Sequence, residues 1–319
     1  MKSFFKKKYY AAIDMGTNSF HLIIVEVKKN GTFKIVDREK VVLRLGSEFE
    51  DINNCISPSE IAEAVSTLKQ FKELANFYDA EIITAATSAI REAANRFEFV
   101  KIVNEETGIK INVIDGLREG ELIFKGITKA LNISSNKILS IDIGGGSTEL
   151  IYSVNNQIEF IRSLKIGAVR LTKMFFRDYV LEHEKIEACK KYIQAEMKLN
   201  IQRTNYQIDF AVGTSGTIQS AANMIAYRQL GKGIANYNGF TFYKEQLNKA
   251  TQIVLGCKTP AERSHLSGIE PKRVDIIPCG LIILNMILDA FKIEKVVISE
   301  NALREGIILN KIEEENPNL

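Results

Sequence analysis

The sequence lacks the cysteine pattern of a zinc-binding or disulfide-rich protein. Its four cysteines are scattered over 319 residues without a Cys-x-x-Cys pair, and no histidine lies near them at ligand spacing. A structural zinc site needs Cys or His ligands at close spacing, and a disulfide framework needs a regular pattern of paired cysteines. We therefore expect neither. Isolated thiols are typical of a reducing compartment, and we therefore expect a cytoplasmic protein.

Long apolar segments and strong charge are missing as well. The chain has no run of about twenty apolar residues, the length that a membrane-spanning helix needs. Residues 1–10 are basic, but they have neither an apolar core nor a small-residue cleavage site, so they do not resemble a secretory signal. A net charge of +3 is too small to indicate nucleic-acid binding, although it allows a local basic groove for an anionic substrate. We expect no membrane and no nucleic-acid partner.

The length of 319 residues is comfortable for two domains. Strand-like and helix-like periodicities alternate, and no long linker separates them, which predicts an α/β fold. The segments predicted as strands are 9–15, 21–27, 32–43, 81–85, 111–114, 138–143, 148–153, 158–164 and 294–299. The main segments predicted as helices are 58–78, 87–94, 97–107, 117–131, 183–203, 217–227, 278–291 and 302–312.

One stretch, residues 138–152, carries most of the functional signal. An apolar run with a single acid, Asp142, ends in three consecutive glycines, and an alternating strand-like segment follows. A buried carboxylate is costly unless a cation or hydrogen-bond donors meet it. Three glycines let backbone N–H groups approach a ligand with no Cβ in the way. A P-loop or a Rossmann turn would require a helix next, so the alternative is a plain hairpin turn.

The same pattern occurs near the N-terminus. Residues 13–23 align without gaps with residues 141–151, which matches Asp14 to Asp142 and Ser19 to Ser147. Both copies follow an apolar strand and precede an alternating one. We infer an internal duplication with one repeat in each domain. The predicted domains are 1–127 and 128–319, with a terminal helix near 302–315 that can pack back onto the first.

Two such hairpins facing each other would form a cleft suited to a phosphorylated ligand. Backbone N–H groups and hydroxyls bind phosphate oxygens. The candidates are Thr17, Asn18, Ser19, Gly144, Gly145, Gly146 and Ser147. The acids Asp14, Asp142 and Glu149 repel phosphate, so we expect them to hold Mg²⁺, or Mn²⁺, beside it. A third turn, at 213–217, enters a helix, and there Ser215 is either a phosphate ligand or only the helix N-cap.

Taken together, the motifs resemble the exopolyphosphatase/guanosine pentaphosphate phosphohydrolase family of the actin, Hsp70 and sugar-kinase superfamily. The segments that carry the resemblance are 12–21, 87–95, 141–149, 166–172, 213–217 and 302–306. The resemblance implies two ribonuclease-H-like (actin-like ATPase) domains with a cleft between them. It also implies removal by water of the terminal phosphate of inorganic polyphosphate, or of the 5′ γ-phosphate of guanosine pentaphosphate.

The resemblance further implies that a glutamate after the last strand of the first domain activates the attacking water. The matching segment is 115–124, which places this role on Glu119, with Glu121 as the alternative. On a helix, residues two apart point about 200° away from each other, so only one of them can face a cleft.

Two further assignments follow from the resemblance. Arg91 would bind a phosphate and stabilise the charge that develops as the bond breaks, although a surface arginine is the alternative. Glu149 would position the metal with Asp142 and help to hold the water. The basic side chains of 165–173 form either a track for a polyanion or an ordinary solvated face, and we do not assign them to the site.

Two other functions compete with hydrolysis. A sugar or acetate kinase would transfer phosphate from ATP, and a sensor would bind polyphosphate or guanosine tetra- or pentaphosphate without cleaving it. The sensor would be favoured if Glu119 or Glu149 were missing, and both are present. Longer relatives carry an additional C-terminal helical domain, so we expect this chain to prefer short polyphosphates. The sequence leaves the oligomeric state open, with a homodimer as one possibility.

Overall fold

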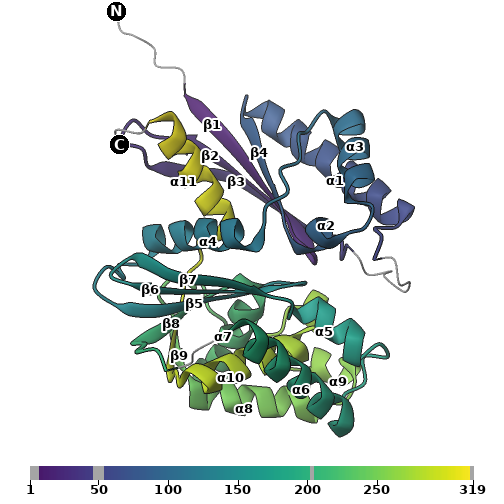
Figure 1. Ribbon diagram of the computed structural model, residues 1–319, viewed down its shortest axis with the longest axis vertical. Helices are drawn as coiled ribbons and strands as arrows, with labels where there is room; N and C mark the ends of the chain where they lie inside the picture. Colours follow the sequence, from purple (N-terminus) through teal and green to yellow (C-terminus); the bar gives the residue numbers. More distant parts are fainter. Residues whose placement is uncertain (1–6, 46–53, 202–204, 317–319) are drawn as a thin grey trace, which may run out of the picture. The chain divides into compact units, whose positions relative to one another are not determined.

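The computed structural model describes residues 7–45, 54–201 and 205–316, which form two units (Figure 1). Unit 1 comprises Met1–Gly126 and Leu303–Leu319, and unit 2 comprises Ile127–Ala302. The chain thus leaves unit 1 within one helix and returns to it for its last helix. Each unit is built on its own sheet, as the α/β prediction requires.

A four-stranded sheet of order β3-β2-β1-β4 lies at the centre of unit 1. The strands are β1 (Lys8–Met15), β2 (Ser19–Val27), β3 (Phe33–Val42) and β4 (Glu81–Ala86). β4 runs parallel to β1, and the other neighbours are antiparallel. The helices are α1 (Pro58–Phe77), α2 (Ser88–Glu92), α3 (Arg96–Thr107), α4 (Gly116–Ala130) and α11 (Leu303–Glu315).

The two faces of the unit 1 sheet are covered by different helices (Figure 1). Successive strand residues point to opposite faces, so Ile13 and Met15 share one face and enter a core with α1 and α3. On the other face, Lys8 and Tyr10 bond to Glu315 of α11. α11 therefore anchors the C-terminal end of the chain to the first strand.

The start of α1 shows how local sequence sets an element boundary. Ser57 is the N-cap, its hydroxyl accepts from the N–H of Glu60, and the Glu60 carboxylate accepts from the N–H of Ser57 at 2.9 Å. Pro58, which has no N–H to leave unsatisfied, occupies the first helical position. The predicted helix start is confirmed.

Unit 2 has a six-stranded sheet of order β7-β6-β5-β8-β10-β9. The strands are β5 (Lys137–Ile143), β6 (Thr148–Val154), β7 (Gln157–Leu164), β8 (Phe210–Thr214), β9 (Thr241–Tyr243) and β10 (Lys295–Ile298). The helices are α5 (Ala168–Phe175), α6 (His183–Asn200), α7 (Ser215–Leu230), α8 (Lys244–Gly256), α9 (Pro260–Ser264), the 3₁₀ turn η1 (Pro271–Arg273) and α10 (Ile277–Phe291). Leu139, Ile141 and Ile143 of β5 point into a core that includes α10, most of whose residues are apolar and buried.

The predicted strand at 111–114 is wrong. The segment runs beside the end of β4 but makes only a single bridge, between Ala86 and Val113. One reason is that the N–H of Asn112 bonds to the side-chain oxygen of Thr84, at 2.8 Å, instead of extending a ladder. The segment is a connection that leads into α4.

The two sheets repeat the same three-strand arrangement, which supports the inferred duplication. In each unit an antiparallel hairpin is followed by a strand parallel to its first member, β4 in unit 1 and β8 in unit 2. The hairpin turns are closed by the same bond: Gly16 N–H donates to Ser19 O at 3.1 Å, and Gly144 N–H donates to Ser147 O at 3.0 Å. The sequence match at 13–23 and 141–151 is therefore also a match of backbone geometry.

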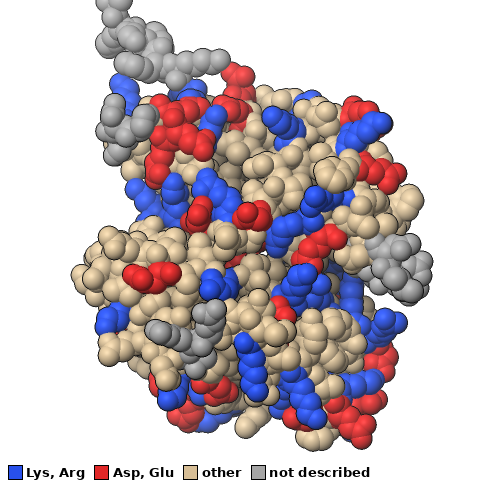
Figure 2. Space-filling model, in the orientation of Figure 1, with Lys and Arg blue, Asp and Glu red and all other residues tan. Residues whose placement is uncertain are grey.

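The surface carries both signs of charge. On the face drawn in Figure 2, acidic and basic side chains are interspersed over both units, in agreement with the small net charge of +3. Among the residues that the structure describes, no helix is long and apolar enough to cross a membrane.

Candidate active site

The glycine turn at residues 144–146 is held from behind by the start of α5. The N–H groups of Ala168 and Val169 donate to the carbonyl oxygens of the first two glycines, at 3.0 and 2.9 Å. Arg170 Nε donates to the carbonyl oxygen of the third at 2.6 Å. Because the N–H and C=O of a peptide point in opposite directions, these bonds turn the following N–H groups away from α5. The turn thus presents a row of N–H donors, as an anion site requires.

Gly167 allows this close approach. A side chain there would overlap the backbone of the turn, because a Cβ would lie 2.5 Å from the carbonyl carbons of Gly145 and Gly146. The sequence marked residues 166–172 as a motif but did not indicate what they do. The support by Gly167 and Arg170 was missed, since nothing local to either residue shows that it lies under a turn twenty residues away.

Asp142 and Glu149 lie opposite each other in the β5–β6 ladder. Directly opposed residues project to the same face with Cβ atoms about 5 Å apart. Glu149 is only 1% exposed, and its Oε1 accepts a bond from Ser163 Oγ at 2.7 Å. Asp142 is half-buried, and its Oδ2 accepts a bond from Thr214 Oγ1 at 2.5 Å. Two opposed carboxylates repel each other when both are ionised, so a cation between them would be stabilising.

Within the described residues, no group of three or more His, Cys, Asp and Glu side chains gathers as a metal cluster. Of the three acids predicted to hold a metal, Asp142 and Glu149 are neighbours in unit 2, whereas Asp14 belongs to unit 1. A pair of carboxylates nevertheless fits Mg²⁺, which commonly keeps several waters and binds through one or two carboxylates and substrate phosphates.

The first glycine turn differs from the second in its chemistry. The residue opposite Asp14 is His21, where unit 2 has Glu149. The His21 ring also bonds to Ser19, with 2.8 Å between Nε2 and Oγ. A pair of directly opposed acids is therefore found in the second turn and not in the first.

Thr17 and Asn18 each have a buried side-chain oxygen without a hydrogen-bond partner among the described residues. Among the described residues, no group bonds to Thr17 Oγ1 or to Asn18 Oδ1, although both atoms are buried. A buried polar atom without a partner is costly and rare. The backbone there is well held, because the N–H groups of Leu43 and Arg44 donate to Asn18 O at 3.1 and 3.0 Å. The role of both residues in ligand binding stays a prediction, and their unpaired oxygens are the observation that bears on it.

Arg91 and Glu119 form a largely buried ion pair in unit 1. Arg91 Nη1 lies 2.8 Å from Glu119 Oε2 and also donates to Ile114 O at 3.1 Å. Glu119 is 6% exposed although it lies in the first turn of α4. A neighbouring guanidinium stabilises the ionised carboxylate, which is the form that can accept a proton.

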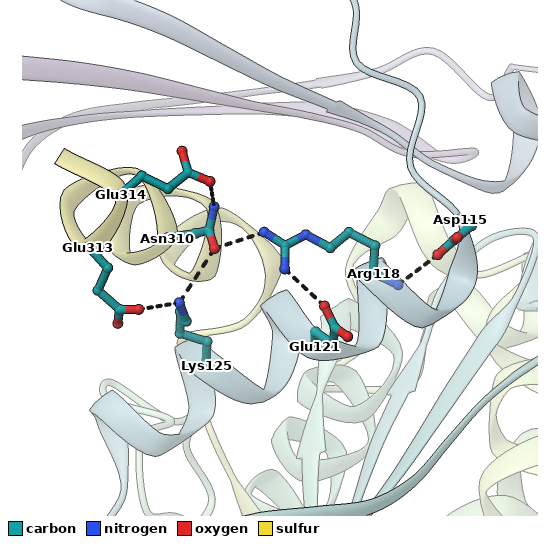
Figure 3. A network of polar contacts seen from close by, with 7 residues as sticks. All are labelled: Asp115, Arg118, Glu121, Lys125, Asn310, Glu313 and Glu314. Carbon is teal, nitrogen blue, oxygen red and sulfur yellow. Dashed lines mark hydrogen bonds and ion pairs between the residues drawn. The ribbon is translucent and has the colours of Figure 1, made fainter. Parts of the chain in front are cut away.

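Glu121 points elsewhere, as the geometry of a helix demands. Its side chain is 48% exposed and bonds to Arg118 Nη1 at 2.9 Å, on the face of α4 that meets α11 (Figure 3). Arg118 also bonds to Asn310 of α11, at 2.8 Å. Of the two candidate acids, only Glu119 contacts Arg91.

Ser215 is not the N-cap of its helix. The N-cap of α7 is Thr214, and Ser215 is the first helical residue, with a strained φ of 80°. Its Oγ is buried, and no described group bonds to it. Strained backbone conformations cluster at active sites and ligand-binding sites. The sequence also gave no sign of Arg273, a largely buried residue whose guanidinium packs against Gly216, the residue after Ser215, and is paired with Glu270 at 2.9 Å.

Comparisons with known proteins identify the family of the chain. The model of the Ppx/GppA phosphatase family matches residues 23–315. Exopolyphosphatase 1 of Mycobacterium leprae is 30% identical over 309 residues, which cover 95% of this chain and 89% of that protein. An exopolyphosphatase structure from Cytophaga hutchinsonii has a TM-score of 0.88 at 25% identity, covering 96% of this chain and 98% of that one.

A second solved structure shows the same relationship. The Aquifex aeolicus member of the Ppx/GppA family has a TM-score of 0.80 at 26% identity, covering 97% of this chain and 99% of that one. The resemblance inferred from the sequence is confirmed, and so is the α/β fold class. The chain belongs to the Ppx/GppA phosphatase family.

Proposed function

We propose that this protein is a metal-dependent exopolyphosphatase, which releases the terminal phosphate of inorganic polyphosphate by attack of water. The proposal follows from family membership and from the likeness to the exopolyphosphatases of M. leprae and C. hutchinsonii. The observation that carries it is the buried pair of Glu119 and Arg91, because a held, ionised carboxylate beside a cation suits a hydrolase rather than a plain binding protein.

Each part of the site has a role in this reaction. Glu119 accepts the proton of the attacking water. Arg91 holds the Glu119 carboxylate in place and neutralises charge on the terminal phosphate as its bond to the rest of the polymer breaks. The N–H groups of the turn at 144–146 bind phosphate oxygens, aided by the hydroxyls of Ser147 and Ser215. In the first turn, Thr17 would donate to phosphate through its orphaned hydroxyl, and Asn18 through its Nδ2, because its orphaned Oδ1 can only accept a bond.

Asp142 and Glu149 would hold Mg²⁺ or Mn²⁺. When bound, the cation neutralises phosphate charge and orients the bond to be broken. The bonds from Thr214 and Ser163 orient the two carboxylates before any cation arrives, as outer residues do in metal sites.

Guanosine pentaphosphate is the alternative substrate, because it ends in the same phosphoanhydride. A substrate panel separates the two and also tests the preference for short chains. Phosphate release would be measured with Mg²⁺ and tripolyphosphate, long-chain polyphosphate or guanosine pentaphosphate, and ADP formation would be measured with ATP plus glucose. We expect the largest kcat/KM for a polyphosphate. Release from none of these substrates would favour a non-hydrolysing sensor instead.

The role of Glu119 is tested against a matched acid on the same helix. Glu119→Gln removes the base but keeps the shape, so kcat should fall by about 10²–10⁴-fold with polyphosphate binding retained. Glu121→Gln alters an exposed acid on the opposite face and should leave kcat nearly unchanged. Near-normal turnover by Glu119→Gln, or a comparable loss in Glu121→Gln, would contradict the assignment.

A further inference from the structure

The polar network between α4 and α11 lies outside the candidate site, yet it contacts the helix that carries Glu119 (Figure 3). Arg118 Nη2 and Lys125 Nζ both donate to the side-chain oxygen of Asn310, at 2.8 and 3.5 Å. Lys125 also pairs with Glu313 at 2.6 Å. Arg118 and Lys125 are two turns apart on one face of α4, so a single α11 residue holds both ends of that segment.

The two helices also meet backbone to backbone. A Cβ on Gly306 of α11 would overlap the carbonyl oxygen of Leu122 and lie 2.6 Å from its carbonyl carbon. Leu122 is buried and lies three residues after Glu119, on the next turn of the helix. Any side chain at residue 306 would therefore push α4 away at the level of Glu119.

α11 is in turn bonded to the unit 1 sheet, and the last strand of that sheet leads into the helix that carries Arg91. Lys311 Nζ lies 2.7 Å from Glu81 Oε1 in the first residue of β4, and Glu315 bonds to Lys8 of β1. Arg91 lies in α2, directly after β4. α11 thus links the sheet to α4, and its position sets where the carboxylate of Glu119 lies relative to the guanidinium of Arg91.

We propose that Gly306 and Asn310 are positioning residues for Glu119. They hold α4 against α11 in the position at which the Glu119 carboxylate forms its ion pair with Arg91. Neither residue contacts the candidate site itself. The inference rests on the proposed function, because it assigns a task to residues that act through the base.

The first test compares two glycine substitutions. Gly306→Ala inserts a methyl group between the helices, whereas Gly256→Ala adds one at the last residue of α8, where a Cβ would meet nothing within 4 Å. Gly306→Ala should lower kcat by about 10–100-fold, the loss expected for a misplacement near 1 Å, and leave KM within about twofold. Gly256→Ala should have wild-type kinetics. A wild-type kcat for Gly306→Ala would overturn the proposal, as would a loss matched by its unfolded fraction in circular dichroism.

The second test asks whether the reduced kcat of Gly306→Ala is caused by displacement of Glu119. If it does, Gly306→Ala should change the slow residual rate of a Glu119→Gln protein by less than about twofold, since the displaced group no longer acts. An equal fractional loss in both backgrounds would overturn the proposal. Asn310→Asp keeps an oxygen acceptor for Arg118 and Lys125 and should retain kcat, whereas Asn310→Ala should reduce it.

A third measurement does not depend on activity. Amide hydrogen exchange in residues 119–122 should be faster in Gly306→Ala than in the wild type, with α8 unchanged, because the packing that holds α4 is lost. Unchanged exchange would overturn the positioning claim. If the wild type releases phosphate from no substrate, the proposed function fails, and this measurement still decides whether Gly306 holds α4.

Discussion

Asp142 and Glu149 face each other across β5 and β6, whereas the corresponding pair in the first hairpin is Asp14 and His21. The duplicated turns have therefore diverged in charge while keeping the same backbone bond. In the second turn two acids share one face of the ladder, and in the first an acid lies opposite a histidine. This difference predicts which turn responds to a divalent cation.

Asp142→Asn should weaken cation binding and relieve the repulsion with Glu149. Without Mg²⁺ the variant should unfold at a temperature equal to or above that of the wild type. A ligand at a hundred times its Kd stabilises a protein by about 2.7 kcal/mol, and the variant should lose most of the Mg²⁺-dependent increase in unfolding temperature. Calorimetry with EDTA and with Mg²⁺ checks this. Asp14→Asn is the matched control, and an equal loss there would contradict a cation site formed by the second turn.

Ser215→Gly should change the free energy of unfolding and the affinity for polyphosphate in different ways. Glycine adopts a φ of 80° without strain, and the substitution removes a buried hydroxyl for which no described partner exists. The free energy of unfolding should stay level or rise by up to about 1 kcal/mol, because the released strain offsets the added chain entropy. KM for polyphosphate should increase because one phosphate donor is gone. Urea denaturation and steady-state kinetics test both parts, and an unchanged KM would remove Ser215 from the site.

The end of α11 should loosen in acid. The bond from Lys8, together with the bonds from Tyr10 and Lys311, lowers the pKa of Glu315 from 4.5 to about 2. A depressed carboxyl pKa in the folded state contributes stability above the unfolded pKa, and this contribution is lost as the pH falls from about 4.5 to about 2. Glu315→Gln lacks this contribution, so its difference in unfolding temperature from the wild type should shrink across that window. A constant difference between pH 5 and 2 would contradict the role of Glu315.

Part of the candidate site could be predicted from adjacent residues. The turn at 144–146 and its copy at 16–19 were found because glycines, a preceding acid and strand periodicity all lie within a dozen residues. The choice between Glu119 and Glu121 was different. Helix geometry showed that only one of them could face a site. The residues next to them do not indicate which one it is. The burial of Glu119 depends on Arg91, which lies on another helix.

The sequence by itself determined the α/β class, the duplicated hairpins and the family, because periodicity, turn residues and motif order are properties of neighbouring positions. The tertiary structure alone decided which acid meets Arg91, that Arg170 and Gly167 support the glycine turn, and that Gly306 lies on the backbone of α4. These contacts join residues far apart in the chain. They depend on how closely two backbones approach, and no local pattern of residues encodes that distance.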